Sequence, residues 1–255
     1  MNSAKKIFTN IYEEAQSDPN IIGFFLGGSR GKGFQTAYSD YDTYIIVKDS
    51  IVKNYKERYP FRKYKGVDLI VFSLSEFKKC VPWGSPEAFG RYSFSHVKAL
   101  IDKNGKIQEL LNEMAKVPEK YLSKFIAESL DAYINFLYRS LKCIRDGDIE
   151  AARLEAAISI PYFLDVVFAI HNGRLRPYYK YLKWELETFP LTKIPLDTGE
   201  IISMLMIILD SADLKTQQQL LRIIEEILRN EGFGKLFESW GSDFPWMIAF
   251  NPSKR

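Results

Sequence analysis

The sequence predicts an α+β protein in which a domain built on a mixed β-sheet precedes an all-helical domain. Short apolar runs bounded by glycine, proline and polar turns fill the first 115 residues, a pattern typical of strands. From residue 116 onward, apolar residues recur every three or four positions, which indicates amphipathic helices. A chain of 255 residues, 46% of them hydrophobic, is long enough to bury two modest cores. We therefore expect two domains, residues 1–115 and residues 116–255.

The N-terminal domain is expected to start with a helix and to continue with strands. Residues 4–16 place their apolar side chains on one face of a helix. Ser73 and Glu76 have the spacing of a capping box, so a second helix is expected to begin there. We expect these helices to cover one face of the sheet. The expected strands are IIGFFL (21–26), YDTYIIV (41–47), VDLIVF (67–72) and SFSHVKALID (93–102).

The C-terminal domain is expected to be a helical bundle. Residues 119–145, 148–171 and 214–230 each show the helical apolar spacing, and Gly232 suits the end of the last helix. The aliphatic positions between Leu220 and Leu228 are expected to form core or a dimer surface, so a homodimer is possible.

Composition excludes several classes of protein. The formal net charge of +3 does not point to a nucleic-acid partner, and it suits a small polyanionic ligand such as a nucleotide. Cys80 and Cys143 are too few and too far apart for a disulfide framework or a zinc site. No apolar run reaches the ~20 residues that a membrane helix needs. We therefore expect a soluble cytoplasmic protein without a membrane partner.

Two carboxylates at the start of the second strand are the first chemical signal. Asp40 and Asp42 are two positions apart, and because side chains alternate along a strand, both are expected on one face. Carboxylates crowded together repel each other unless a cation lies between them. Oxygen ligands of this kind suit Mg²⁺, which is usually bound by one or two carboxylates together with substrate phosphates.

A glycine turn precedes this pair. A buried strand leads into Gly27-Gly28-Ser29, where glycine allows a phosphate to approach the backbone closely. A helix that starts after Ser29 would direct backbone N–H groups at that phosphate, and Arg30 or Lys32 would add positive charge. The alternative is an ordinary strand-to-helix turn with surface charges.

A third carboxylate is expected from the next strand. Asp68 begins the apolar run VDLIVF, and a neighbouring strand would bring it beside Asp40 and Asp42. Two metal ions about 3.5–4 Å apart would then stabilise the attacking and leaving oxygens of an in-line displacement. A solvated strand end is the alternative for Asp68.

The order of these motifs resembles the nucleotidyltransferase fold of the DNA polymerase beta superfamily over roughly residues 20–110. Gly28-Ser29 matches its Gly-Ser motif, Ser39-Asp40-Tyr41-Asp42 matches its paired-aspartate motif, and Asp68 matches its third aspartate by context. The resemblance implies transfer of a nucleoside monophosphate from a nucleoside triphosphate such as ATP to a hydroxyl group, with two Mg²⁺ ions. It implies metal binding by the three aspartates and nucleotide binding by Gly28, Ser29, Arg30 and Ser39.

Segment 172–180 (NGRLRPYYK) resembles a segment of bacterial aminoglycoside and lincosamide nucleotidyltransferases. This resemblance implies a small antibiotic-like hydroxyl acceptor and a role in antibiotic resistance. The alternatives are a protein or RNA acceptor, although nucleic acid is not the expected partner, and a non-catalytic nucleotide-binding or antitoxin-like interaction protein.

The helical domain contributes further candidates. Glu155 is the candidate general base, with an ordinary helix charge as the alternative. Asp165 lies among apolar residues and needs either a function or a buried ion-pair partner. Residues 174–184 mix cations with aromatics, which suits either ligand binding or an amphipathic packing face. His96 and His171 are expected to be structural.

Overall fold

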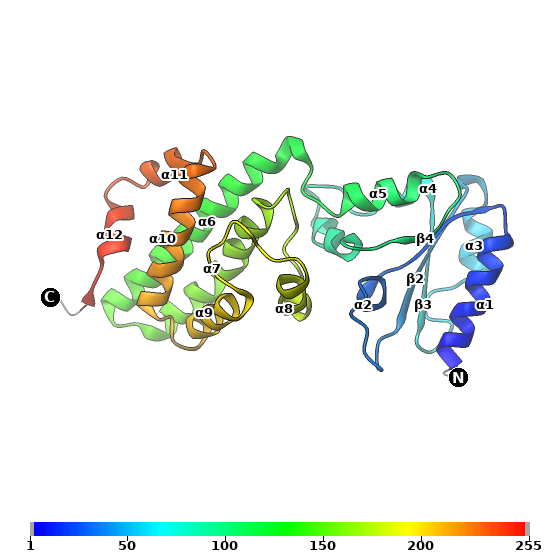
Figure 1. Ribbon diagram of the computed structural model, residues 1–255, viewed down its shortest axis with the longest axis horizontal. Coiled ribbons are helices and arrows are strands. Elements are labelled where there is room, and N and C mark those ends of the chain that lie inside the picture. The colour runs from blue at the N-terminus through cyan, green and yellow to red at the C-terminus, as the bar shows by residue number, and fades with distance from the viewer. Residues whose placement is uncertain (1–2, 253–255) are drawn as a thin grey trace. The chain divides into compact units, whose positions relative to one another are not determined.

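A computed structural model of the chain describes residues 3–252. The chain divides into two compact units, Met1–Pro118 and Glu119–Arg255. The expected α+β class is confirmed, because the first unit holds a four-stranded sheet and the second is helical (Figure 1). Among the described residues, no helix combines the length and apolar character needed to cross a bilayer.

The first unit is built on a mixed sheet of strand order β3-β2-β1-β4. β2 and β3 run parallel, whereas β1 is antiparallel to both β2 and β4. The elements are α1 (Ser3–Ser17), β1 (Ile21–Leu26), α2 (Gly28–Gly31), β2 (Tyr41–Val47), η1 (Asp49–Ile51), α3 (Val52–Arg58), β3 (Val67–Ser73), α4 (Leu74–Phe77), η2 (Pro86–Phe94), β4 (Ala99–Asp102) and α5 (Lys106–Met114).

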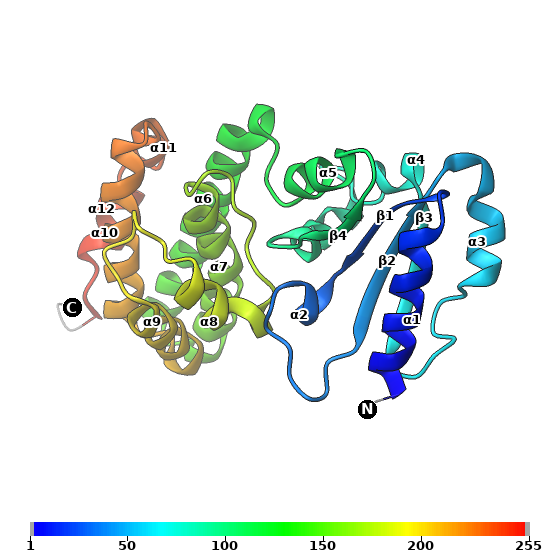
Figure 2. The ribbon, with the colours of Figure 1, turned by 45° about the vertical axis from the view of Figure 1, so that its right-hand side comes forward.

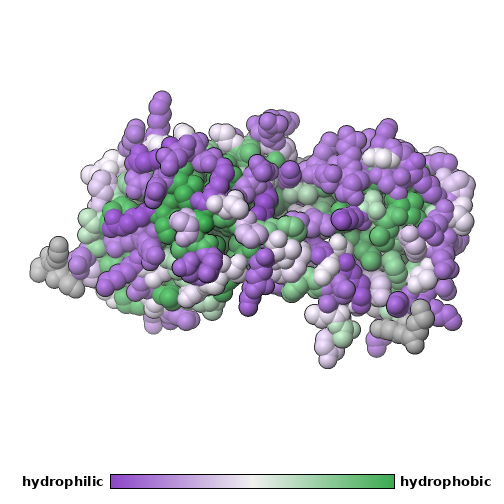
Figure 3. Space-filling model, viewed as in Figure 1, coloured by the Kyte–Doolittle hydropathy of each residue, from purple (hydrophilic) through white to green (hydrophobic). Residues whose placement is uncertain are grey.

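Helices cover both faces of this sheet, although the sequence analysis expected them on one (Figures 1 and 2). Ile45 belongs to the core shared with α1 and α3, whereas its neighbour Ile46 belongs to the core shared with α4 and α5. Consecutive apolar residues in a strand point to opposite sides, so both sides must be covered. On α5 the apolar side is buried, and the surface over this helix is hydrophilic (Figure 3).

The fourth strand is shorter than predicted. Only Ala99–Asp102 pairs with β1, whereas Pro86–Phe94 forms the 3₁₀ segment η2. His96 has a φ of +63°, in the left-handed region, which interrupts an extended chain. Buried Arg91 holds the preceding segment by donating hydrogen bonds to backbone carbonyls, at 3.0 Å to Val81 and 2.7 Å to Glu113. Long-range side-chain contacts therefore override the strand pattern here.

The capping box is confirmed. The Ser73 hydroxyl accepts a hydrogen bond from the Glu76 N–H at 3.1 Å, and the Glu76 carboxylate accepts one from the Ser73 N–H at 2.9 Å. This reciprocal pair satisfies two backbone donors at the start of α4. It also ends β3, so the polar signal in the sequence marks the strand boundary.

The second unit is a helical bundle arranged around α7. This helix is apolar on nearly all sides and packs against α6 and α9. Gly232 follows α10 with a φ of +92°, as expected for a residue that ends a helix. The helices are α6 (Glu119–Asp146), α7 (Ile149–Ala169), α8 (Tyr179–Thr188), α9 (Thr198–Ser211), α10 (Leu214–Asn230), α11 (Gly234–Ser239) and α12 (Asp243–Ala249).

One hydroxyl in this core makes no hydrogen bond to any described residue. Tyr133 of α6 is 2% exposed, packs against Phe163 with tilted rings whose centres are 5.7 Å apart, and its phenolic oxygen has no partner. Burial raises the pKa of this phenol far above its usual range, so it stays neutral.

We predict that Tyr133→Phe leaves the free energy of unfolding unchanged or raises it by up to about 1 kcal/mol, because an unpaired buried hydroxyl is removed. Ser140→Ala is the matched control. Its hydroxyl donates to the Ala152 carbonyl at 3.0 Å, so its loss should lower the free energy of unfolding by about 1 kcal/mol. Urea denaturation measures both, and a larger loss in Tyr133→Phe than in Ser140→Ala would contradict the assignment.

Candidate functional site

Two aspartates face each other across the parallel strands. In the register of β2 and β3, Asp42 lies opposite Asp68. Adjacent strands are about 4.8 Å apart, and paired residues of parallel strands project from the same face. Both side chains are half-buried. The fold thus brings together two carboxylates that are 26 positions apart in the chain.

The glycine turn fits closely around Asp42. Gly28 has a φ of +54°, and a Cβ placed on it would lie 1.9 Å from the Asp42 Oδ2. Only glycine combines this backbone conformation with this approach. The Gly27 N–H also donates to the Asp42 backbone carbonyl at 2.7 Å. The turn therefore lies directly against one of the two facing carboxylates.

Hydrogen bonds tie the turn to the segment that enters β2. The Ser29 hydroxyl donates to the Ser39 hydroxyl at 2.8 Å, and the Thr36 N–H donates to the same oxygen at 2.9 Å. The Arg30 guanidinium donates to the Ser39 carbonyl at 2.8 Å and to the Asp40 carbonyl at 3.1 Å, and it lies 4.0 Å over the Tyr41 ring. Arg30 and Ser39 thus shape the loop. Any contact of theirs with a nucleotide remains a prediction.

Asp40 does not form a metal-binding group with the facing pair among the described residues. It precedes β2, which begins at Tyr41, so the alternation of strand side chains does not fix its direction. Its exposed carboxylate lies toward Gly66, where an added Cβ would be 3.6 Å from the Asp40 Oδ1. Within residues 3–252, no three His, Cys, Asp or Glu side chains are grouped closely enough to hold a metal ion. The structure thus brings together two of the three predicted carboxylates.

Two carboxylates still suit one Mg²⁺, which usually takes one or two protein carboxylates and completes its shell with water and phosphate oxygens. Asp42 and Asp68 would hold such an ion, and the absence of a side chain at Gly28 allows the Asp42 carboxylate to lie against the glycine turn. A second ion would require Asp40 to turn toward the pair.

Lys32 is a structural residue, which corrects the expectation that it adds charge for a phosphate. Its side chain is 7% exposed, and its ammonium donates to the backbone carbonyls of Tyr92, at 3.0 Å, and of Ser95. It also lies 4.5 Å over the Tyr92 ring. Its positive charge is therefore directed at η2 and the residue that follows it.

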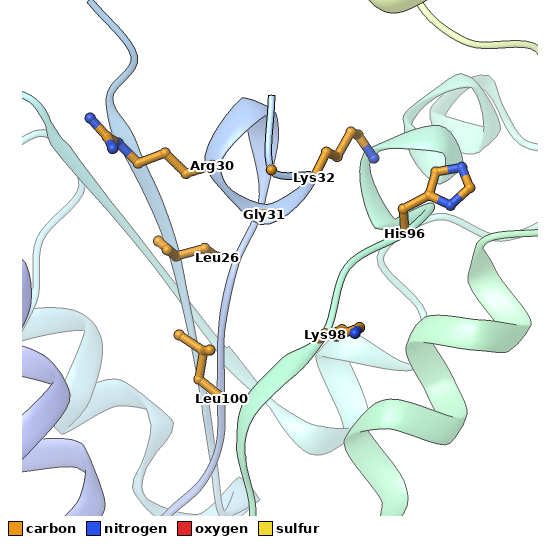
Figure 4. A pocket seen from close by; sticks show the side chains of 8 residues that line it. Leu26, Arg30, Gly31, Lys32, His96, Lys98 and Leu100 are labelled. Carbon is orange, nitrogen blue, oxygen red and sulfur yellow. The ribbon is translucent and has the colours of Figure 1, made fainter. Parts of the chain in front are cut away.

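A cavity of about 270 Å³ lies on the Gly31–Gly33 side of the α2 turn. In Figure 4 the Lys32 side chain points toward the segment that carries His96, and the Arg30 side chain points to the opposite side. None of the three aspartates contributes to its wall, so the cavity is distinct from the carboxylate pair. It is lined by Leu26, Arg30, Gly31, Lys32, Gly33, His96, Lys98 and Leu100.

The two candidate acids of the helical unit, Glu155 and Asp165, are held in ion pairs. The Glu155 Oε1 lies 2.5 Å from the Arg139 Nη2 of α6, and its Oε2 is buried without a hydrogen-bond partner among the described residues. The Asp165 Oδ1 lies 2.8 Å from the Arg176 Nε. Burial raises the pKa of Asp165, and the charge of Arg176 opposes that rise. Asp165 is therefore the buried ion-pair residue that the sequence left open, and Glu155 bridges two helices.

Part of the cation-aromatic run around residues 174–184 packs inward. Arg174 pairs with buried Glu185 at 2.8 Å, and Tyr181 is 2% exposed. The buried imidazole of His171 lies 2.7 Å from the Val167 carbonyl through Nδ1 and accepts from the Lys193 N–H at 2.9 Å through Nε2. Burial lowers the pKa of His171, consistent with a neutral structural ring.

The sequence analysis passed over one exposed segment beside the carboxylates. Phe61–Lys65 (FRKYK) carries three cations and two aromatics and leads into Gly66 and β3. The close spacing of cations and aromatics is the sequence signal for this surface, whereas the net charge of +3 does not reveal it.

No family model matches the chain, and no curated protein is similar to it. Among solved structures it is similar to a nucleotidyltransferase-like protein from Exiguobacterium sibiricum 255-15, with 12% sequence identity, coverage of 89% of this chain and 80% of that chain, and a TM-score of 0.40.

We predict that Lys32→Met lowers the free energy of unfolding by about 2–3 kcal/mol, because the carbonyls of Tyr92 and Ser95 lose a charged donor. Lys98→Met, at an exposed position of the same cavity, should change it by less than about 0.5 kcal/mol. Denaturant unfolding measures both values. Equal stability of the two variants would mean that the Lys32 ammonium is free to bind a ligand.

Proposed function

We propose that this protein transfers a nucleoside monophosphate from a nucleoside triphosphate to a hydroxyl acceptor, with Mg²⁺ bound at Asp42 and Asp68. The observation that supports this proposal most directly is the register of β2 and β3, which pairs Asp42 with Asp68 on neighbouring strands while Asp42 lies against Gly28. Facing carboxylates repel each other unless a cation or proton lies between them. A glycine turn next to them offers a place for the anion that such a cation would carry.

The chemistry is a displacement at phosphorus. The acceptor hydroxyl oxygen attacks the α-phosphorus and the bond to the bridging oxygen of pyrophosphate breaks, while the hydroxyl proton passes to a base or to water. Bound Mg²⁺ would supply charge neutralisation for the phosphate oxygens. Asp42 and Asp68 would orient the ion, and the Ser29 hydroxyl, 2.8 Å from Ser39, could turn from this partner to a phosphate oxygen.

Positioning and electrostatics therefore carry the proposed catalysis. Asp40 would join the site as a third ligand after a side-chain rotation, which its exposed position allows. The proposal assigns no side chain of the helical unit as the general base. Glu155 is not assigned this role because it is paired with Arg139.

A small hydroxyl compound of the antibiotic type is the first acceptor to assay, because segment 172–180 resembles the corresponding segment of drug-modifying nucleotidyltransferases. Tyr179 of this segment is 57% exposed, so its ring is accessible to a ligand. Such a ring could stack on a planar acceptor group.

We predict that Asp42→Asn and Asp68→Asn each reduce pyrophosphate release by at least about 100-fold, because each removes half of the charge that holds the ion. Asp210→Asn, an exposed carboxylate of α9, is the matched control and should retain full activity. The assay supplies Mg²⁺, each of the four common nucleoside triphosphates and a panel of hydroxyl acceptors. Thermal unfolding should confirm that all three variants remain folded.

Normal turnover by Asp42→Asn would refute the assignment. Calorimetry with the magnesium nucleotide gives the second readout. Binding without pyrophosphate release for every acceptor tested would instead indicate a nucleotide-binding protein that lacks transferase activity.

A further inference from the structure

Five exposed cations lie near the end of the sheet where β3 begins. Arg62, Lys63 and Lys65 belong to the segment that enters β3, and Lys5 and Lys6 belong to the first turn of α1. These two segments meet where a Cβ on Gly66 would lie 3.3 Å from the Ala4 Cβ. Figures 1 and 2 both show the start of α1 beside the chain that leads into β3. We call these five cations, together with Phe61, the basic rim.

No cation of the basic rim is held in an ion pair within the described part of the chain, although the Asp40 carboxylate lies toward the neighbouring Gly66. Lys56 and Arg58 of the preceding helix α3 are paired with Glu76 and Glu14. By contrast, the cations of the basic rim form no ion pair with any residue between 3 and 252. No acidic residue interrupts positions 58–67, and the first one to follow is Asp68. The positive field of the rim therefore faces solvent next to the carboxylate pair.

The backbone holds Arg62 where glycine would be favoured. Two consecutive turns form the segment, closed by hydrogen bonds from the Lys63 N–H to the Pro60 carbonyl at 3.3 Å and from the Val67 N–H to the Tyr64 carbonyl at 3.2 Å. The third position of each turn has a positive φ, +77° at Gly66 and +59° at Arg62. Turns of this kind favour glycine at that position. The second turn has the favoured glycine at this position, whereas the first has Arg62. An arginine at a strained position points to a function for its side chain.

An aromatic ring accompanies these cations. Phe61 is 56% exposed, and the Arg62 guanidinium lies 4.9 Å from its ring centre. Guanidinium groups and aromatic rings on a basic surface are platforms on which unpaired bases stack, while the neighbouring ammonium groups contact phosphates.

We propose that the basic rim binds a single-stranded polynucleotide, with phosphates on Lys5, Lys6, Lys63 and Lys65 and a base stacked at Phe61 and Arg62. This proposal goes beyond the transfer reaction and does not depend on it, because binding requires neither Mg²⁺ nor the aspartates. A single strand fits better than an anionic membrane because one exposed ring on a tight turn provides a stacking site but little apolar area for insertion.

Fluorescence anisotropy with a labelled oligouridylate of about 16 nucleotides, titrated between about 50 and 200 mM salt, tests the proposal. Each phosphate contact on a single strand contributes about −0.7 to the slope of log K against log salt, so four contacts give a slope near −2.8. We expect Lys63→Ala/Lys65→Ala to make the slope less steep by about 1.4. Lys124→Ala/Lys183→Ala, which removes two exposed lysines of the helical unit, should leave it unchanged.

Arg62→Gly separates binding from folding. Glycine suits a φ of +59°, so the melting temperature should stay the same or rise, while affinity for the oligonucleotide should fall. Arg62→Lys should keep the salt slope, because the four phosphate contacts belong to the lysines, while affinity should fall with the loss of the stacked guanidinium. Phe61→Ala should weaken binding by about ten-fold with the salt slope retained, as the loss of one stacked base predicts.

Three results would overturn the proposal. The first is a salt slope that is the same in the wild type and the Lys63/Lys65 variant. The second is an equal reduction of the salt slope in the Lys124/Lys183 control. The third is rim-dependent binding to phosphatidylserine vesicles with none to the oligonucleotide, which would assign the rim to a membrane surface. Normal pyrophosphate release without oligonucleotide binding would reject polynucleotide binding by the basic rim but not the proposed transfer reaction. The two proposals can therefore be tested independently.

Discussion

The register between β2 and β3 is the constraint on which the candidate site depends. A slip of one residue would send Asp68 to the opposite face and separate it from Asp42. The hydrophobic cores prevent that slip, because Val67, Leu69 and Val71 fill the core under α1 and α3 while Phe72 on the other face packs toward α4. The energy that places two like charges side by side therefore comes from apolar packing on both faces of the sheet. The carboxylate pair is a consequence of how this sheet is buried.

The two cations in the turn that leads from β1 into α2 are bound to the protein's own backbone and are therefore not free to bind a ligand. Arg30 and Lys32 donate to backbone carbonyls, Arg30 toward the entry of β2 and Lys32 toward η2. Those bonds stabilise two irregular segments that have no strand partners to satisfy their carbonyls. A phosphate beside Gly28 would then be held chiefly by a metal ion, the Ser29 hydroxyl and the backbone. This makes the proposed reaction more dependent on the cation at Asp42 and Asp68 than a site with free arginines would be.

Local and periodic features of the fold could be predicted from the sequence. The first three strands, the capping box at Ser73, the long helices and the α+β class follow from patterns that span fewer than thirty residues. The exceptions are set by distant contacts. The strand expected over 93–102 forms only from Ala99, because Lys32 donates to the Ser95 carbonyl and Arg91 ties the preceding segment η2 to the Val81 carbonyl. Asp40 departs from the predicted trio because it lies one residue before the strand whose alternation was used to orient it. The sequence predicted only that the strand of Asp68 lies beside the strand of Asp42. The structure adds which residues pair, and it pairs Asp68 with Asp42.

The two basic-aromatic segments show why residue type alone does not identify a binding surface. Segment 174–184 drew attention in the sequence, yet Arg174 and Arg176 are paired with Glu185 and Asp165, each eleven positions away. Segment 61–65 has similar composition, yet its cations form no ion pair with any described residue. Net charge cannot separate these cases, because paired and unpaired cations count equally in a total of +3. What distinguishes them is whether the fold supplies a carboxylate, and a cation without one retains its electrostatic attraction for an external polyanion.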